Sequence, residues 1–301
     1  MKKQFQLVSL SILMLFAGYS CSKKFMVIDS PLLQPPARVL KERPNVALVL
    51  GGGAFHGMAH AGVIKALEDA GIPIDLIVGT SAGSMVGALY ADNPNIDDLI
   101  PLIKSTKAKD VFDFSLSRVG FVSGKKLQRY MTNQLRATQI EDTQIPFVAV
   151  TTDIEKGKSV ALRAGPISAS VNASCAIPGI FEPVKMYGTT FVDGGVIDGV
   201  PVNIAKEYHP KYIIAVRIMQ FDTIVALKNR KKVVLRAYDV ASHYANEESI
   251  SLANIIIQPN LKDLSLMGGK DNEKIYELGI IAAKEMLPEI RSELKKRNIL
   301  K

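Results

Sequence analysis

The sequence has no tryptophan and only two cysteines, Cys21 and Cys175, among its 301 residues. Two cysteines cannot build a disulfide framework, so we exclude the class of small disulfide-stabilised secreted domains. The chain also lacks internal repeats and low-complexity tracts, which excludes repeat arrays. With 48% hydrophobic residues, a chain of this length can bury the core of a single α/β domain.

The N-terminal segment carries an apolar run, Leu7–Ala17, that is too short to span a bilayer as a helix. It follows Lys2 and Lys3. A basic start followed by a short apolar run is typical of a secretory signal peptide. We therefore predict that residues 1–20 are a signal peptide and that the protein is exported.

The segment Gly18-Tyr19-Ser20-Cys21 resembles the lipobox of bacterial lipoproteins, in which the cysteine is diacylated and becomes the first residue. The pattern predicts a lipid on Cys21 and attachment to a membrane of the cell envelope. Gly18 stands where lipoproteins prefer leucine. Secretion without lipid and an uncleaved anchor therefore stay open as alternatives.

Residues 21–44 contain four prolines and show no apolar periodicity. Segments of this composition are typical of extended linkers. We expect an N-terminal tether over 21–44, anchored or secreted, and one folded domain over 45–301.

The net charge of the chain is +8. A basic balance suits an anionic membrane surface or a nucleic acid, but no nucleic-acid-binding module is present, so we expect no nucleic acid as partner. Lysine and arginine cluster at 228–232 and at 295–301. We interpret both clusters as solvated helix faces or tails, with lipid contact as the alternative.

The domain begins with a strand, a glycine-rich turn and a helix. The apolar run Val46–Leu50 predicts a buried parallel strand, and Gly51–Gly57 leads into a helix that ends at Gly71. A second buried strand is predicted at Ile74–Val78, followed at once by a helix to about Tyr90. This order is typical of a parallel α/β sheet.

The rest of the domain continues this alternation. Further strands are predicted at Phe147–Thr151, Ser159–Leu162, Phe191–Val192, Tyr212–Arg217 and Ile255–Ile257. Helices are predicted at Ser123–Leu135, Ile167–Ala173, Asn203–Glu207, Val225–Ser249 and Asn272–Met286. We expect residues 93–122 to be irregular, either a mobile apolar lid or a packed connection.

The turn after the second strand reads Gly79-Thr80-Ser81-Ala82-Gly83, a G-x-S-x-G pattern. Between a strand and a helix this pattern forms a nucleophile elbow, whose flanking glycines leave room for neighbouring elements. Ser81 would then stand at the carboxyl edge of the sheet, near a helix N-terminus that favours developing negative charge. Ser81 is therefore the candidate nucleophile.

The glycine-rich turn after the first strand offers backbone N–H groups that can point at one small region. Such donors suit an oxyanion hole, and we assign them to Gly51, Gly52, Gly53 and Ala54. Glycine loops also bind dinucleotides, but this one lacks the middle glycine, and the ribose-binding acid is missing at the end of the second strand. We expect no cofactor and no metal.

Asp193 ends a predicted strand and is followed by Gly194 and Gly195. Two glycines leave its carboxyl free to approach a nucleophile. A Ser–Asp–His triad is the alternative, with His209 or His243 as third member. Ser81 follows only the second strand, earlier than in α/β-hydrolases, so we interpret both histidines as surface residues.

Six segments of the domain occur in a fixed order. They are Leu48-Val49-Leu50-Gly51-Gly52-Gly53, His60-Ala61-Gly62-Val63, Ile77-Val78-Gly79-Thr80-Ser81-Ala82-Gly83, Gly120-Phe121-Val122-Ser123-Gly124, Ser174-Cys175-Ala176-Ile177-Pro178-Gly179-Ile180-Phe181 and Val192-Asp193-Gly194-Gly195. In this order they resemble the patatin-like phospholipases over about Val46–Arg217, with weaker likeness to the end of the chain.

The resemblance implies a three-layer α/β fold with a mostly parallel central sheet flanked by helices. It also implies a Ser–Asp dyad in which Ser81 is the nucleophile and Asp193 the only base. The glycine turn, chiefly Gly52 and Gly53, would form the oxyanion hole. The motif glycines Gly57, Gly79, Gly83, Gly194 and Gly195 would support this geometry.

The activity implied is metal-free hydrolysis of acyl esters in phospholipids or lysophospholipids. Two departures from the family bear on turnover: Ala54 stands where another glycine is usual, and His56 where arginine or lysine is usual. Two alternatives therefore stay open. One is a hydrolase of short-chain esters or thioesters, and the other is a non-catalytic lipoprotein that binds acyl lipids.

Overall fold

The computed structural model describes residues 25–113, 119–219, 230–262, 264–265 and 270–301. The strands are β1 (Met26–Val27), β2 (Val46–Leu50), β3 (Leu76–Thr80), β4 (Phe147–Asp153), β5 (Lys158–Leu162), β6 (Val184–Met186), β7 (Thr189–Asp193), β8 (Tyr212–Val216) and β9 (Ile255–Ile257). The helices are α2 (Met58–Asp69), α3 (Ala82–Asp92), α4 (Ile96–Ser105), α5 (Ala108–Val111), α6 (Lys125–Gln134), α7 (Ile167–Ser174), α8 (Val202–Lys206), α9 (Arg230–Ile250) and α10 (Asn272–Lys296). Short 3-10 turns lie at η1 (Ala54–Gly57), η2 (Ile140–Asp142) and η3 (Gly194–Val196).

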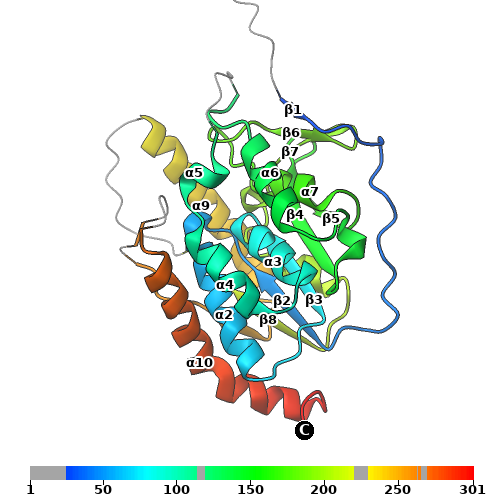
Figure 1. Cartoon of the computed structure of the whole chain (residues 1–301), viewed down its shortest axis with the longest axis vertical. Coiled ribbons are helices and arrows are strands. Elements are labelled where there is room, and N and C mark those ends of the chain that lie inside the picture. Colours follow the sequence, from blue (N-terminus) through cyan, green and yellow to red (C-terminus); the bar gives the residue numbers. More distant parts are fainter. Residues whose placement is uncertain (1–24, 114–118, 220–229, 263, 266–269) are drawn as a thin grey trace, which may run out of the picture.

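The strands of the described residues form one sheet in the order β1-β6-β7-β4-β3-β2-β8-β9, with β5 paired to β4 (Figure 1). The strands β4, β3, β2, β8 and β9 run parallel, whereas β7 runs antiparallel to both β4 and β6. The predicted mostly parallel sheet is confirmed. The carboxyl ends of its parallel strands lie along one edge, where α/β folds bind their ligands.

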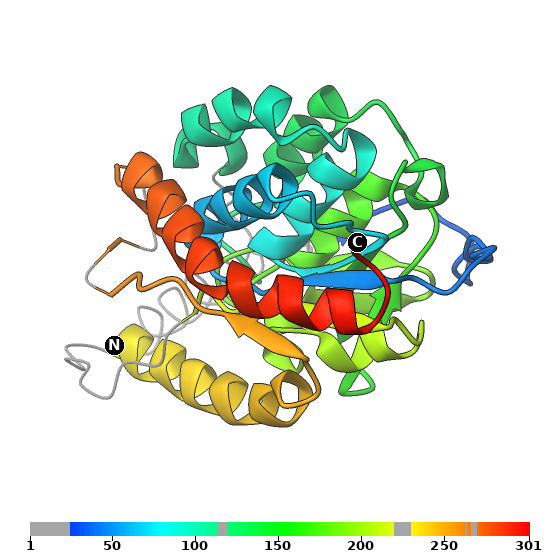
Figure 2. The ribbon, with the colours of Figure 1, turned by 90° about the horizontal axis from the view of Figure 1, so that it is seen from below.

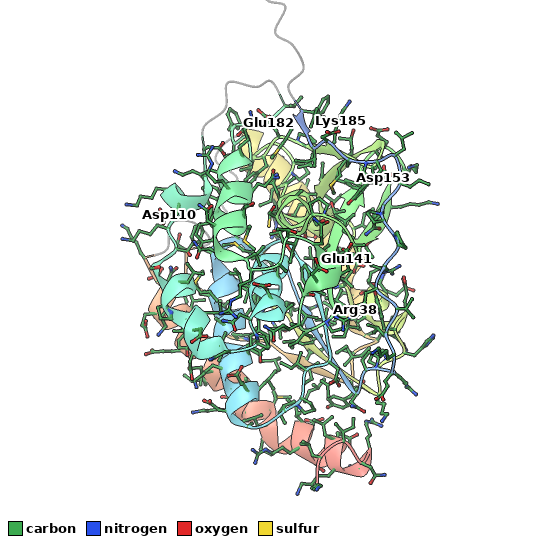
Figure 3. The ribbon with its side chains drawn as sticks, turned by 45° about the vertical axis from the view of Figure 1, so that its right-hand side comes forward. Arg38, Asp110, Glu141, Asp153, Glu182 and Lys185 are labelled. Carbon is green, nitrogen blue, oxygen red and sulfur yellow. The ribbon has the colours of Figure 1, made fainter. Side chains whose placement is uncertain are left out.

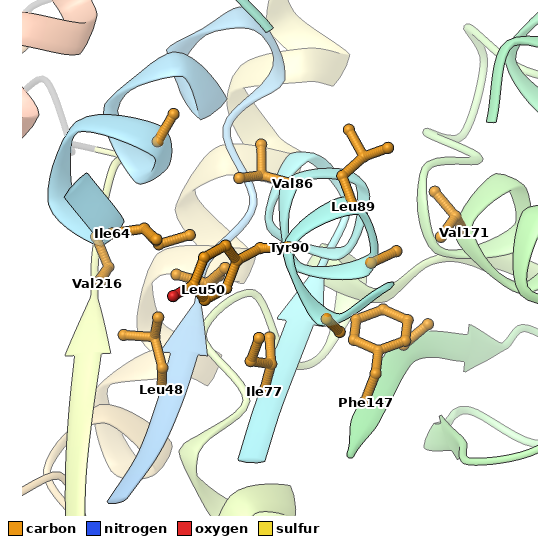
Figure 4. Packing of buried hydrophobic residues seen from close by; sticks show 14 of the residues in the cluster. Leu48, Leu50, Ile64, Ile77, Val86, Leu89, Tyr90, Phe147, Val171 and Val216 are labelled. Carbon is orange, nitrogen blue, oxygen red and sulfur yellow. The ribbon is translucent and has the colours of Figure 1, made fainter. Parts of the chain in front are cut away.

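Helices cover both faces of the sheet, which gives the predicted three layers. Leu48 and Leu50 of β2 enter a core with Ile64 of α2, whereas Val49 enters a second core with Val202 of α8. Successive side chains of a strand point to opposite faces, so a strand buried on both faces reads as one apolar run. Figure 2 shows α9 on one side of the sheet and α2 and α4 on the other, and Figure 4 shows the packing of the larger core.

The long helix α10 lies directly against α2. A Cβ added to Gly62 would lie 2.0 Å from the Tyr276 carbonyl oxygen, and one added to Gly279 would lie 2.2 Å from the Ala59 carbonyl oxygen. Only glycine permits so close an approach of two helix backbones. The contact holds the start of α2, and with it the glycine-rich turn, against the rest of the domain.

Most predicted elements lie within two residues of the observed ones: the second strand is shifted by two residues, and only the end of the last helix was further off. The second strand starts at Leu76 and ends at Thr80, because the Asp75 carboxylate binds the N–H groups of Asn45 and Val46 at 2.8 and 3.0 Å and closes the preceding loop. The last helix continues past the predicted end to Lys296, since residues in its final turns are still buried in the core. The predicted helix residues 225–229 lie outside the described residues.

The segment 93–122 was expected to be irregular, and this expectation was wrong, because it contains α4 and α5. Asn95 caps α4 by accepting a hydrogen bond from the Asp97 N–H. Ile96, Leu99 and Ile103 then fall on one buried face. The segment is thus a packed connection as far as residue 112. Residues 114–118, which would belong to the alternative lid, lie outside the described residues.

Part of the expected N-terminal tether joins the sheet. Met26 and Val27 pair with β6 as an edge strand, next to Lys185 (labelled in Figure 3). The Lys185 ammonium of β6 lies 4.5 Å from the centre of the Phe25 ring. The predicted signal peptide and Cys21 lie outside the described residues. Among the residues described, no helix combines the length and hydropathy needed to cross a bilayer.

Candidate active site

Ser81 occupies a sharp turn between β3 and α3. Its backbone has φ 52° and ψ −122°, a left-handed conformation that non-glycine residues rarely adopt. A Cβ on Gly79 would lie 2.5 Å from the Gly83 carbonyl oxygen, and one on Gly83 would lie 2.0 Å from the Leu50 carbonyl oxygen. The two motif glycines therefore allow β2, β3 and α3 to meet at the turn, as the G-x-S-x-G pattern predicts.

The elbow is held by its own backbone groups. The Ser81 N–H donates to Ser174 Oγ at 2.9 Å, and the Ser174 hydroxyl donates to the Val150 carbonyl at 2.6 Å. The Ser81 carbonyl accepts hydrogen bonds from the Ser84 hydroxyl and N–H. These bonds offset the strain of the turn, and none of them uses the Ser81 hydroxyl. Sequence reasoning did not assign a role to Ser174, although it lies in a quoted motif.

Asp193 ends β7 and is 2% exposed, beside the 6% exposed Ser81. Burial raises the pKa of the Asp193 carboxyl to about 6, while the Ser81 hydroxyl and the Gly195 N–H oppose this rise. The Gly195 N–H donates to Asp193 Oδ1 at 2.7 Å. Among the described residues, no donor reaches Asp193 Oδ2 at a normal hydrogen-bond distance and angle. One carboxylate oxygen is therefore available next to Ser81.

Cys175 is a third group at this site. It is a free, buried thiol, and its sulfur lies 3.9 Å from Ser84 Oγ. Burial and the nearby Asp193 charge raise the pKa of the Cys175 thiol, against the influence of Ser84 and Ser81. The thiol therefore stays protonated at neutral pH and does not compete with Ser81 as the nucleophile.

The glycine turn faces the elbow, and its N–H groups divide into two pairs. A Cβ on Gly52 would lie 3.3 Å from the Ser81 Cβ. The Gly51 N–H donates to the Val216 carbonyl at 3.0 Å, and the Gly52 N–H donates to the Gly199 carbonyl at 2.9 Å. Within the described residues, the N–H groups of Gly53 and Ala54 donate to no protein group. The N–H groups available to bind an oxyanion are therefore those of Gly53 and Ala54. The N–H groups of Gly51 and Gly52, which were also predicted as oxyanion donors, instead hold the turn in place.

Two buried histidines support this turn. His60 Nε2 lies 2.7 Å from the Gly51 carbonyl oxygen, and burial lowers the pKa of His60 to about 4, so the neutral ring donates this bond. His56 Nε2 lies 3.2 Å from the Leu264 carbonyl oxygen, and burial lowers its pKa too. At pH 7 neither ring supplies a positive charge, unlike the cation usual in the family at position 56.

An aromatic cluster starts one residue after Ala54. The Phe55 and Phe112 ring centres lie 6.1 Å apart, those of Phe112 and Phe181 lie 5.5 Å apart, and both pairs meet edge to face. Edge-to-face contact is a favourable geometry for aromatic rings. The cluster forms an apolar region that extends from the glycine turn to the segment joining α7 and β6.

The other two histidines lie elsewhere. His209 is an exposed loop residue with φ 52°, whose carbonyl accepts a hydrogen bond from Arg43. His243 lies on α9, with its ring against Tyr244 and Nδ1 3.6 Å from the Glu247 carboxylate. Neither has a recorded contact with Ser81 or Asp193, in agreement with the two-residue interpretation.

The loop after Asp193 touches both turns. Thr80 Oγ1 donates to the Asp198 carbonyl at 2.8 Å, and the Gly199 carbonyl accepts from Gly52. A Cβ on Gly194 would lie 2.4 Å from the Val150 carbonyl oxygen, and one on Gly57 would lie 2.9 Å from the Ala82 Cβ. These motif glycines therefore allow close packing. Within the described residues, no group of three acidic, histidine or cysteine side chains is placed to hold a metal.

Ala54 has φ 48°, a conformation that suits glycine. Ala54→Gly is expected to keep or raise the free energy of unfolding by up to about 1 kcal/mol, because relief of roughly 1–2 kcal/mol of strain exceeds the added chain entropy. Ala54→Val should lower it by about 1–3 kcal/mol. Urea unfolding of the three proteins measures this difference, and equal destabilisation by both substitutions would contradict it.

Comparison with known proteins agrees with this geometry. The family model described as patatin-like phospholipase matches residues 48–206. Lysophospholipase NTE1 of Scheffersomyces stipitis is 35% identical over 192 residues, which cover 62% of this chain and 12% of that protein. An uncharacterized NTE family protein of Mycobacterium bovis is 37% identical over 162 residues, 53% of this chain and 45% of that protein. The matches thus span less than half the length of these relatives.

The structure of VipD from Legionella pneumophila is similar at a TM-score of 0.52 and 14% identity, and the match covers 92% of this chain and 73% of that one. At this identity the likeness concerns the fold alone. The family model covers more than half of the chain and includes the glycine turn, the elbow and the Asp193 loop. The chain belongs to the patatin-like phospholipase family.

Proposed function

We propose that this protein hydrolyses acyl esters of phospholipids or lysophospholipids, with Ser81 as nucleophile and Asp193 as base. Membership of the patatin-like phospholipase family and similarity to proteins named lysophospholipase support a lipid ester as substrate. The observation that carries the catalytic assignment is the buried Asp193 carboxyl beside Ser81, with its pKa raised to about 6.

The raised pKa explains how a carboxylate can act as the base. A carboxyl with a pKa near 3.8 is a weak base, and a rise to about 6 increases its proton affinity on the order of 100-fold. At pH 7 to 8 the group is still mostly ionised. Asp193 therefore combines the charged form with usable basicity, as a general base requires.

The reaction proceeds in two halves. Asp193 accepts the Ser81 proton while the Ser81 oxygen attacks the ester carbonyl, and the N–H groups of Gly53 and Ala54 stabilise the resulting oxyanion. Collapse breaks the bond to the alcohol, which leaves with the proton held by Asp193. Water then attacks the acyl-enzyme and gives its proton to Asp193, the bond between the acyl group and the Ser81 oxygen breaks, and Asp193 returns the proton to that oxygen as the fatty acid leaves.

The apolar surroundings favour a long acyl chain. The cluster of Phe55, Phe112 and Phe181 starts beside the oxyanion turn. Phe55 and Phe181 are buried and Phe112 is half-buried, so Phe112 supplies the accessible part of the cluster, and burial of methylene groups against it contributes about 0.8 kcal/mol each. We therefore infer that turnover of micellar lysophospholipid exceeds that of a short nitrophenyl ester, and the opposite order would favour the short-chain alternative.

We further propose that the protein is exported and anchored to a membrane through a lipid on Cys21. Three residues separate Cys21 from Phe25, where the described chain begins next to β6. A tether this short would keep the domain close to the membrane that supplies its substrate.

The Ser81–Asp193 dyad predicts how much activity each of three substitutions removes. Ser81→Ala should abolish both lipid hydrolysis and labelling by a fluorophosphonate probe, and Asp193→Asn should lower kcat by about 10²–10⁴-fold. Asp92→Asn is the matched control, because its carboxyl is also buried but accepts hydrogen bonds from the Arg136 and Ala137 N–H groups, outside the candidate site, and it should keep most of the activity. Full activity of Ser81→Ala would overturn the proposed function.

The free energy of unfolding of Asp193→Asn at pH 8 shows whether this variant loses activity because the base is gone or because the fold is damaged. The pKa of Asp193 is higher in the folded protein than in the unfolded chain, so this group stabilises the fold below about pH 4 and the contribution is lost as pH rises through about 6. Asp193→Asn should therefore be up to about 3 kcal/mol more stable than wild type at pH 8, and the difference should shrink by pH 4.

The same pKa predicts the pH dependence of activity. Only ionised Asp193 can accept the Ser81 proton, so kcat/KM should fall as pH falls through about 6. A pH profile with a short, soluble ester measures this acid limb without changes in lipid packing. A limb near pH 4 would show that burial does not raise the pKa in the working enzyme.

Lipidation of Cys21 is tested by radiolabelled palmitate in a bacterial host that expresses the full chain. Wild type and Cys175→Ala should both carry label and sediment with membranes, since Cys175 is a buried thiol. Cys21→Ala should lose the label and leave the membrane fraction. Label that persists in Cys21→Ala, or is absent from wild type, would contradict the proposal.

A further inference from the structure

The loop from Asp193 to Gly199 connects every part of the candidate site. Its Gly195 N–H donates to Asp193 Oδ1 at 2.7 Å, and the Gly199 carbonyl accepts from the Gly52 N–H at 2.9 Å. The Asp198 carbonyl between them accepts from Thr80 Oγ1 at 2.8 Å. The position of this one loop therefore affects the base, the elbow and the oxyanion turn.

Helix α9 holds this loop at two points. Asn246 Oδ1 accepts hydrogen bonds from the N–H groups of Gly199 and Val200, the second at 3.2 Å. The Ser242 hydroxyl donates to the Gly195 carbonyl. Asn246 Nδ2 in turn donates to the Ser242 carbonyl at 2.5 Å. Because residues four apart lie on the same helix face, α9 presents both groups to the loop together.

This face of α9 is polar where burial would favour an apolar residue. Asn246 is 8% exposed, whereas Ile250, one turn later on the same face, packs into the smaller core. Burial of an amide costs free energy unless its hydrogen bonds are made. The Asn246 amide oxygen is bonded to the Asp193–Gly199 loop, and its amide nitrogen is bonded to the backbone of α9. The residue thus serves the loop rather than the core.

We propose that Asn246 and Ser242 are positioning residues, which fix the Asp193–Gly199 loop so that the oxyanion donors and the base keep their places around Ser81. The inference rests on the proposed function and extends the site to a helix that begins 37 residues after Asp193.

Asn246 acts on the oxyanion turn. It fixes the Gly199 N–H, and the carbonyl of the same residue binds Gly52, directly before the free donors of Gly53 and Ala54. Preorganised donors lose effect when they move, and a shift of about 1 Å can cost on the order of 100-fold in rate.

Ser242 acts on the base. Its hydroxyl holds the carbonyl of Gly195, whose N–H binds the Asp193 carboxylate. An N–H donor to a carboxylate stabilises the charged form. Release of Gly195 would weaken that donor and favour the protonated carboxyl.

Ser249 provides a matched control on the same helix. It is 7% exposed, and its hydroxyl donates to the Val200 carbonyl and accepts from the Val202 N–H at the start of α8. Ser249→Ala therefore also removes buried hydrogen bonds that seat α9, including one to the Asp198 side chain, but it removes none to a backbone group of the Asp193–Gly199 loop.

The experiment compares full-length wild type, Asn246→Ala and Ser249→Ala by kcat, KM, Tm and rate of Ser81 labelling by a fluorophosphonate. Both variants should lose Tm. Asn246→Ala should lose about 10–100-fold in kcat and in labelling rate with little change in KM, because it disturbs groups that act in the transition state. Ser249→Ala should stay within about 3-fold of wild type at a temperature where all three are folded.

The outcomes distinguish failure of the proposed function from failure of the positioning role. If wild type is not labelled at Ser81, the proposed function fails and the positioning role fails with it. If wild type is labelled and Asn246→Ala matches Ser249→Ala in kcat and labelling, only the positioning role is overturned.

Ser242→Ala gives an independent readout. The acid limb of its kcat/KM profile should move to higher pH than in wild type, because the Gly195 N–H no longer holds the Asp193 charge as firmly. Ser249→Ala should leave the limb in place. An unchanged limb in Ser242→Ala would overturn the proposed link between α9 and the base.

Discussion

The site depends on close contact between two backbone turns at the carboxyl edge of the sheet. A Cβ on Gly83 would meet the Leu50 carbonyl oxygen at 2.0 Å, and a Cβ on Gly52 would meet the Ser81 side chain at 3.3 Å. Because β2 and β3 are neighbours in parallel register, their turns leave the sheet side by side, and glycine lets them touch. The proposed nucleophile, Ser81, and the free N–H groups of Gly53 and Ala54 thereby come together without a side chain that spans the distance.

Burial supplies the basicity that the proposed role of Asp193 needs. Among the described residues, only the Ser81 hydroxyl and the Gly195 N–H oppose the rise in the pKa of the Asp193 carboxyl. A nearby arginine or lysine would hold the carboxylate ionised but would weaken it as a proton acceptor. The same burial keeps Cys175 protonated next to Ser81. One environment thus raises the pKa of the carboxyl and of the thiol, which makes the carboxylate a stronger base and keeps the thiol protonated.

The sequence predicts the parts of the fold whose determinants are local. Continuous apolar runs identify β2 and β9, and the G-x-S-x-G turn places Ser81. The helices α4 and α5 were missed, because their apolar faces are short and are completed by packing against the larger core. The roles of Asn246 and Gly199 could not be predicted, since their contact joins residues 47 apart and no local pattern marks a helix residue that bonds a distant loop. The division of the turn into bonded and free N–H groups likewise depends on β8 and Gly199.

The two departures from the family act at one place. A cation at position 56 would add positive potential near the oxyanion, whereas His56 stays neutral between backbone carbonyls. In the proposed reaction, charge stabilisation is then left to the backbone donors, one of which belongs to Ala54 in a left-handed conformation. Donors without a supporting charge must be accurately placed to be effective. This requirement explains why the turn is held from three sides: by β8 at Gly51, by His60 at the Gly51 carbonyl, and by Gly199 at Gly52. Asn246 completes the arrangement because it holds the third of these contacts.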